Sequence, residues 1–208
     1  MDSGSNVSIN SPQALAALQT MTNWVETLSP SRVTDYSSES ARLAWQRGEA
    51  VFMRNWPEAY FLANDATVST VEGKFDIAPL PHGKDRQVSH STLGGWSLAI
   101  NASSTKPEAA WNFVHWMIQH DAQKQGAINA GWMPCLAGLY DDFDLTHKSP
   151  LFGKLKPILQ DALPRPVSPR YTELSAVLRN HVFGVLKGWE KPQDALKKME
   201  HDLRALQP

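Results

Sequence analysis

The apolar run from Ala50 to Trp56 is followed directly by proline, and this junction restricts the fold more than any other part of the sequence. A short run rich in Val and Phe is typical of a strand, whereas a proline at the next position is typical of the first residue of a helix. The pattern predicts a strand at 50–56, a helix from Pro57, and Trp56 at the corner between them. Such corners are where α/β folds hold ligands.

A second corner is predicted at Gly94-Gly95-Trp96, where two glycines permit close approach of the backbone beside another large ring. Two tryptophans at two corners, with the planar guanidinium of Arg170, would supply the flat faces and fixed donors that a sugar ring needs. The alternative is that both rings belong to the core and that Arg170 is a surface residue paired with Glu173. Residue types alone leave both interpretations open.

The rest of the chain reads mainly as amphipathic helices separated by proline and glycine. Helices are expected at 11–28, 37–47, 104–118, 121–130, 149–159, 170–187 and 192–206, and further strands at 75–79 and 96–101. Five of the eight tryptophans fall on these helical patterns, where core packing is expected; they are Trp24, Trp45, Trp111, Trp116 and Trp189. The helix from Pro107 is expected to bury a stripe that includes Trp111 and Ile118.

Composition narrows the range of partners. The 208 residues include 20 basic and 21 acidic side chains, so the net charge is close to zero. This balance gives no indication of binding to nucleic acid or to an anionic membrane. The single cysteine, Cys135, rules out an intrachain disulfide and is expected to be a small buried apolar residue. The sequence has no apolar stretch of membrane-spanning length, and its first residues lack the pattern of a signal peptide.

No spacing of residues points to catalysis, a metal or a cofactor, so none is expected. His115 and His120 lie five positions apart, which does not place them on one face of a helix. The acidic residues at 141, 142 and 144 lack the glycine and distal glutamate of an EF-hand, so a solvated acidic turn is expected. Gly94-Gly95 does not extend into a phosphate-binding loop.

A predicted helix is followed by four motifs in order, at residues 44–57 (AWQRGEAVFMRNWP), 75–81 (FDIAPLP), 94–100 (GGWSLAI) and 106–111 (KPEAAW). In this order the motifs resemble the second half of a family 1 extracellular solute-binding protein of an ABC sugar importer, and most of all the trehalose/maltose-binding branch. The resemblance runs from about Ser8 to the end of the chain.

The resemblance implies an α/β, helix-rich, periplasmic-binding-protein-like fold of type II, in which two lobes enclose a sugar by hinge closure. Residues 1–90 and 146–208 would belong to the C-terminal lobe. Residues 91–145 would cross the hinge and supply a partial segment of the N-terminal lobe, packing on a sheet that lies outside this chain. The apolar surface left by that sheet would favour association.

The resemblance also assigns ligand-binding roles. Those expected to line the cleft are Trp56, Gly94, Gly95, Trp96 and Arg170, with Tyr60 and Glu58 beside Trp56 as further candidates. The expected ligand is a neutral sugar such as a maltose- or trehalose-like disaccharide. The expected partners are the permease subunits of the transporter, and the intact protein is expected in the periplasm or another extracytoplasmic space, associated with the membrane.

Two other functions remain open at this stage. A carbohydrate-active enzyme would need two carboxylates across the cleft, and only Glu58 stands near a predicted ligand corner. A stand-alone helical protein-interaction module would instead keep its tryptophans shielded.

Overall fold

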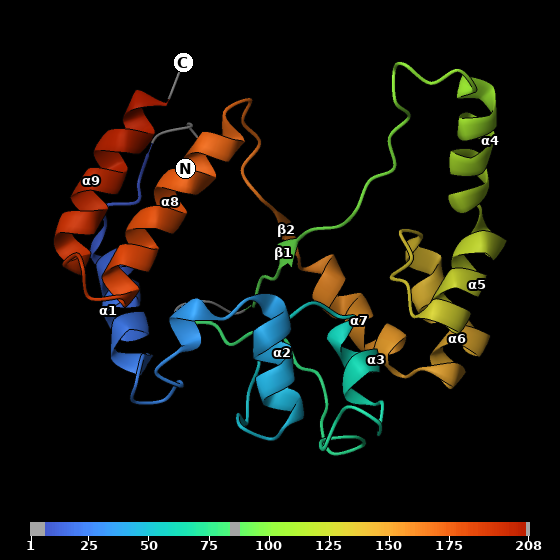
Figure 1. Ribbon diagram of the computed structural model, residues 1–208, viewed down its shortest axis with the longest axis horizontal. Helices are drawn as coiled ribbons and strands as arrows, with labels where there is room; N and C mark the ends of the chain where they lie inside the picture. The colour runs from blue at the N-terminus through green and yellow to red at the C-terminus, as the bar shows by residue number, and fades with distance from the viewer. Residues whose placement is uncertain (1–6, 84–87, 207–208) are drawn as a thin grey trace. The chain divides into compact units, whose positions relative to one another are not determined.

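The computed structural model describes residues 7–83 and 88–206, which separate by packing into two units (Figure 1). The first unit combines the chain up to Glu39 with the chain from Pro166 onward. The second unit comprises Ser40–Arg165. Each unit has a buried core of its own.

The first unit is built from α1 (Pro12–Trp24), the 3₁₀ helix η1 (Val33–Asp35), α8 (Tyr171–Leu186) and α9 (Pro192–Ala205). The Ser11 hydroxyl caps α1 by accepting from the backbone nitrogen of Ala14 at 3.2 Å. The prolines that begin α1 and α9 stand where a missing N–H costs nothing. The sequence therefore sets the start of both helices.

The core of the first unit forms where α1 packs on both α8 and α9. Leu18 of α1, Val185 of α8 and Met199 of α9 belong to one buried cluster, and each is at most 5% exposed. Burial of these side chains, each contributing roughly 1.5–3 kcal/mol, is the main force that holds the three helices together.

The first helix ends earlier than predicted. It stops at Trp24 rather than near Leu28 because Glu26 adopts a left-handed conformation, with φ of 68°. A non-glycine residue in that region interrupts helical hydrogen bonding, and Val25 instead forms an isolated bridge with Ser29. Leu28 is left 79% exposed.

The second unit contains most of α2 (Ser38–Gln46) and all of the elements between it and Arg165. These are α3 (Ala59–Ala63), β1 (Thr92–Leu93), α4 (Pro107–Met117), α5 (His120–Ala130), η2 (Ala137–Asp141), α6 (Phe143–Lys148), α7 (Leu151–Gln160) and β2 (Leu163–Pro164). The helices predicted from 37, 104, 121, 149, 170 and 192 are thus confirmed to within a few residues. Pro157 lies inside α7, where it lacks the N–H that a helical hydrogen bond needs.

The core of the second unit lies between α5, η2, α6 and α7. Leu139, Leu145 and Phe152 are fully buried there. Tyr140 is also buried, and its hydroxyl donates to the carbonyl of Pro134 at 2.8 Å. Burial raises the pKa of Tyr140 to about 12.

Among the described residues, the sheet consists of one pair of parallel strands, β1 and β2. Thr92 of β1 pairs with Leu163 of β2, and the Leu163 nitrogen donates to the carbonyl of Ser91 at 2.9 Å. The strands predicted at 50–56, 75–79 and 96–101 do not form: these segments find no pairing partner within the described chain. Pairing defines a strand, and an apolar pattern alone does not supply it.

Gln46 links α2 to the segment that contains α3 through a side-chain hydrogen bond. Its side chain is 1% exposed, and its Nε2 donates to the carbonyl of Leu62 at 2.6 Å. Its side-chain oxygen accepts from Arg42, and its backbone carbonyl accepts from the Thr70 hydroxyl at 2.8 Å. A buried amide is tolerated here because these polar groups are satisfied.

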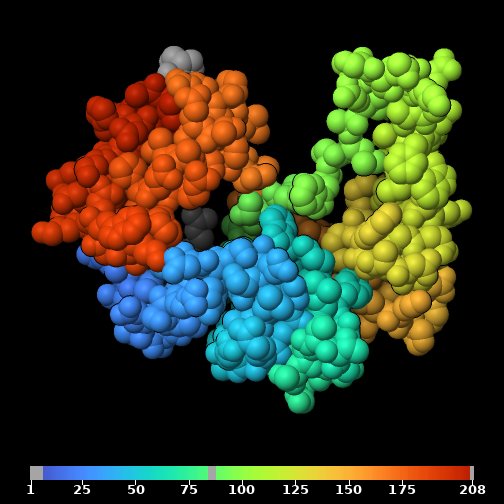
Figure 2. Space-filling model, in the orientation of Figure 1, coloured from blue at the N-terminus to red at the C-terminus, as the bar shows by residue number. Residues whose placement is uncertain are grey.

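Helix α4, green in the space-filling view of Figure 2, lies at the surface and presents aromatic side chains to solvent. Trp111, Phe113 and Trp116 are each more than half exposed, and none of its residues is buried. The expected buried stripe is therefore wrong, as is the expected burial of Trp24 and Trp189, since of the five tryptophans on helical patterns Trp45 alone is buried. A helix this apolar normally packs against another layer.

Candidate functional site

Trp56 stands at the predicted corner. An extended segment leads to it, and the backbone nitrogens of Ala59 and Tyr60 then donate to the carbonyls of Trp56 and Pro57, at 3.1 and 3.0 Å. Helix α3 begins from that turn, two residues after the predicted Pro57. The Asn55 side chain accepts from the Trp56 nitrogen at 2.8 Å, which fixes the backbone direction at the corner.

Gly94 lies directly against the Trp56 ring. A Cβ atom at position 94 would stand 2.8 Å from Cη2 and 3.0 Å from Cζ3 of that ring, closer than carbon atoms approach. Trp56 nevertheless remains 47% exposed. The structure thus brings together two of the predicted site residues and leaves part of the indole accessible to a ligand.

Gly95 and Trp96 take no part in the contact between Gly94 and the Trp56 ring. Open space surrounds the position that a Cβ of Gly95 would take. The Trp96 ring is fully exposed, and it pairs with no aromatic ring in the described chain. Residues 94–106 form the irregular segment that leads from β1 to α4 in Figure 1.

Tyr60 and Glu58 lie on the turn that opens α3. Tyr60 packs edge-on against Phe61 and Phe75, with ring centroids 5.8 and 5.3 Å apart. It also lines an open cavity of about 460 Å³ between α3, α5, α6 and the start of α7. Glu58 occupies the N-cap position of α3 and is exposed, without a side-chain capping bond.

Arg170 belongs to the first unit, at the N-cap of α8. Its Nε donates to Glu173 Oε1 at 3.0 Å, and its Nη2 pairs with the second oxygen of the same carboxylate. This hydrogen-bonded pairing raises the pKa of Arg170 and lowers the pKa of Glu173. The guanidinium is therefore held in one orientation, although both side chains remain about half exposed.

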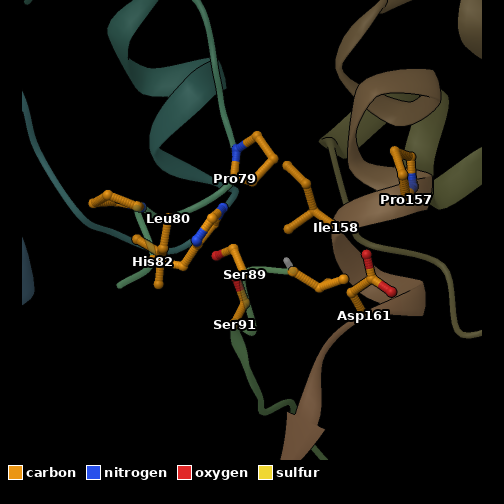
Figure 3. A pocket seen from close by; sticks show the side chains of 10 residues that line it. Pro79, Leu80, His82, Ser89, Ser91, Pro157, Ile158 and Asp161 are labelled. Atoms are coloured by element: carbon orange, nitrogen blue, oxygen red, sulfur yellow. The ribbon is translucent and has the colours of Figure 1, made fainter. Parts of the chain in front are cut away.

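A second cavity, of about 480 Å³, lies between the loop that follows Pro79 and the end of α7 (Figure 3). The side chains of His82 and Ser89 face those of Ile158 and Asp161 across it. His90 holds this loop to the helix, since its Nδ1 lies 2.8 Å from the Asp161 carbonyl. None of the predicted ligand residues lines this cavity, and no sequence motif indicated it.

The acidic turn is neutralised by lysines. Lys124 Nζ lies 2.9 Å from Asp142 Oδ2 and 2.7 Å from Asp144 Oδ2, and Lys156 pairs with Asp141. Hydrogen bonding to Lys124 lowers the pKa of Asp142, whose Oδ1 also caps α6. Within residues 7–83 and 88–206, no group of three His, Cys, Asp or Glu side chains is arranged to hold a metal ion.

Cys135 is exposed, so its expected burial is wrong. The buried position in this segment is taken by Pro134, and the neighbouring cysteine faces outward. Gln123 anchors it: Nε2 lies 2.9 Å from Sγ, and Oε1 accepts from the Cys135 nitrogen at 2.9 Å. None of the helices in the described residues is long and apolar enough to cross a membrane.

Comparison with known proteins gives a consistent result. The sequence profile of a family described as bacterial extracellular solute-binding protein matches residues 2–124. A probable ABC transporter-binding protein of Deinococcus radiodurans is 36% identical over 206 residues, which cover 98% of this chain and 49% of that protein.

Solved structures show the same relationship. Maltose-bound MalE3 of T. maritima is 39% identical with a TM-score of 0.93, over 100% of this chain and 54% of that one. A solute-binding protein of Agrobacterium radiobacter K84 in complex with ribitol is 27% identical with a TM-score of 0.86, over 100% of this chain and 53% of that one. The chain thus spans about half the length of these relatives and shares their fold. It belongs to the bacterial extracellular solute-binding protein family.

Proposed function

We propose that this chain forms part of the carbohydrate-binding subunit of an ABC importer. The observation that carries the proposal is the Trp56 indole, packed against the Gly94 backbone and still 47% exposed. A rigid aromatic face is suited to removing the C–H surface of a sugar ring from water. The maltose and ribitol bound by the two similar proteins support this ligand class.

The ligand is a neutral sugar, such as a maltose- or trehalose-like disaccharide. Trp56 and Gly94 form one part of its site, and Gly95, Trp96, Arg170, Tyr60 and Glu58 remain proposed contributors. Arg170 would release Glu173 or share its donors between that carboxylate and sugar hydroxyls. Guanidinium nitrogens in a fixed plane are effective donors to neighbouring hydroxyls.

Residues 1–90 and 146–208 form the C-terminal lobe of the intact protein under this proposal, and 91–145 cross the hinge into the N-terminal lobe. The exposed aromatic surface of α4, Trp111, Phe113 and Trp116, supports the assignment because it needs a covering layer. The remaining half of the relatives' length is of the right size to supply it. The chain by itself would associate through this surface.

The intact protein would act in the periplasm or another extracytoplasmic space and deliver its sugar to the permease subunits at the membrane. The family description, extracellular solute-binding protein, supports this location. Binding rather than hydrolysis is proposed because Glu58 is the carboxylate at the Trp56 corner, whereas glycosidases use a pair. Incubation with aryl glycosides should release no aglycone.

Isothermal titration of the intact protein with maltose, trehalose and ribitol tests the ligand class. We expect saturable binding of at least one disaccharide, and a Trp56→Ala variant should bind it at least about tenfold more weakly, equivalent to 1.4 kcal/mol. Trp189→Ala is the matched control, since Trp189 is 74% exposed and lies in the first unit. No heat of binding with any neutral sugar would contradict the proposal.

A further inference from the structure

The open cavity between the loop that follows Pro79 and the end of α7 presents side chains that solvent reaches (Figure 3). Pro79, His82 and Asp161 on its wall are exposed, and Ser89 and Ile158 are partly exposed. Its volume of about 480 Å³ lies in the size range of sites for small organic molecules. Its described lining residues all belong to the second unit, and none of them is a proposed contributor to the sugar site.

The apolar part of the wall is aliphatic. It comes from Leu80 and Val88 on the loop and from Ile158 on α7, together with proline rings on both sides. Prolines and branched aliphatic side chains lose little conformational entropy when a ligand packs against them. No Trp, Tyr or Phe of the described residues lines the cavity, so it lacks the flat apolar face on which sugar rings stack. A compact aliphatic group is the body that this wall fits.

Negative charge gathers at the α7 side of the cavity. The Asp161 carboxylate lies on the wall and forms no ion pair or side-chain hydrogen bond within residues 7–83 and 88–206. Asp161 is also the C-cap of α7, where the aligned peptide dipoles leave partial negative charge, and the last turn of this helix has no basic side chain. Both features attract a cation.

The opposite side of the cavity carries hydrogen-bond acceptors. His82 Nδ1 lies 3.0 Å from the Gly83 carbonyl, and because a carbonyl only accepts, the neutral ring carries its hydrogen on Nδ1 and a lone pair on Nε2. The hydroxyls of Ser89 and Ser91 can also accept. No Lys or Arg of the described residues lines the cavity. The attraction of a cation to Asp161 is therefore not opposed by a lysine or arginine on the described wall.

We propose that this cavity binds a small aliphatic amine in its ammonium form, independently of the sugar site. The ammonium pairs with the Asp161 carboxylate at the end of α7, and the aliphatic body packs on Leu80 and Ile158. Two bonds hold the loop against the helix: His90 Nδ1 lies 2.8 Å from the Asp161 carbonyl, and the Leu163 nitrogen donates to the Ser91 carbonyl. The two sides of the site are thus positioned before a ligand arrives.

The test uses cyclohexylamine as the probe and the amide NMR spectrum of the isotopically labelled chain. We expect saturable shifts at Ser89, Ser91, Ile158 and Asp161, with a dissociation constant on the order of millimolar for so small a ligand. Cyclohexanol has nearly the same shape without the charge, so it should bind at least about fivefold more weakly. Absence of saturable shifts with cyclohexylamine, or equal affinity for the two probes, would overturn the proposal.

Variants decide whether Asp161 holds the ammonium. Asp161→Asn keeps the size of the side chain and the backbone carbonyl that His90 contacts, and it should weaken cyclohexylamine binding about fivefold or more. Asp121→Asn is the matched control, because it removes the same charge from a carboxylate of the second unit that lies outside the cavity and is 98% exposed. It should leave the affinity unchanged. Equal affinities in the two variants would refute the assignment to Asp161.

Trp56→Ala separates this cavity from the sugar site. The cyclohexylamine shifts at Ser89 and Asp161 should persist in that variant, whereas disaccharide binding by the intact protein should weaken. Loss of the shifts in Trp56→Ala would place the amine at the Trp56 corner and contradict a separate site.

Discussion

His181 Nδ1 lies 2.8 Å from Glu190 Oε2, and this contact joins the last turns of α8 to the connection that leads into α9. The other ring nitrogen lies 3.3 Å from Asp202 Oδ2 on α9. Lys198 and His201 flank the same two carboxylates. The imidazole side chain is only 19% exposed, so solvent screens these pairs less than it screens surface pairs.

The first prediction concerns pH. Hydrogen bonding to Glu190 raises the pKa of His181 above its ordinary value of 6.5, so the native state binds this proton more tightly than the unfolded chain does. The resulting stability is fully present below pH 6.5 and is lost as the pH rises through the raised pKa. His181→Gln should therefore reduce the free energy of unfolding by about 1 kcal/mol near pH 5.5, and by less near pH 8.5.

Urea unfolding at the two pH values measures this difference. The pKa values of Glu190 and Asp202 are lowered, so their own contribution disappears only at more acidic pH. His201→Gln is the control, because the His201 side chain is 86% exposed and its Nδ1 pairs with Asp202 at the surface. An equal effect of His181→Gln at both pH values would show that His181 acts through packing.

The second prediction concerns Gly94→Ala. The added methyl group would displace the Trp56 ring, so we expect a changed tryptophan emission spectrum and a stability loss of about 1–3 kcal/mol. Under the proposed function, disaccharide affinity should fall about tenfold. Gly95→Ala offers a matched control, since open space surrounds that position. Identical spectra for the two variants would be incompatible with the contact described above.

The third prediction concerns Gln46. Replacement by Leu removes the donor to the Leu62 carbonyl and the side-chain oxygen that accepts from Arg42, at a position that is 1% exposed. We expect the free energy of unfolding to fall by about 1–3 kcal/mol. Gln19→Leu on the exposed face of α1 should change it by less than about 0.5 kcal/mol. Thermal and urea unfolding of both variants provide the measurement.

The fourth prediction concerns the aromatic surface of α4. Replacing Trp111 and Trp116 together by Glu should shift the chain from associated species toward monomer in sedimentation velocity. The helical content should stay the same, because both side chains are more than half exposed and contribute little to the core. Unchanged sedimentation of a self-associating chain would show that association uses another surface.

The sequence predicted local features well because their causes are local. Ser11 and Pro12 set the start of α1, and the proline after Trp56 placed the corner to within two residues. The contact between Trp56 and Gly94 could not be predicted, since it depends on how segments 38 positions apart meet in space. The motifs indicated only that both positions matter.

Failures of prediction share one physical reason. The periodicity of α4 identifies an apolar helix but not the layer that covers Trp111 and Trp116. Similarly, the alternation at 96–101 identifies extended backbone but not its pairing partner. The unpaired hydroxyl of Ser149 left no trace in the sequence, because serine before proline is an ordinary way to begin a helix.

The parallel pairing of β1 with β2 has a mechanical consequence. The pairing joins the two ends of the segment formed by residues 94–162. The Leu163 nitrogen donates to the Ser91 carbonyl in this short ladder. If residues 94–162 moved as one rigid segment, the hydrogen bonds between β1 and β2 would have to twist or break first. The exchange rate of the Leu163 amide proton is therefore a sensitive gauge of such movement.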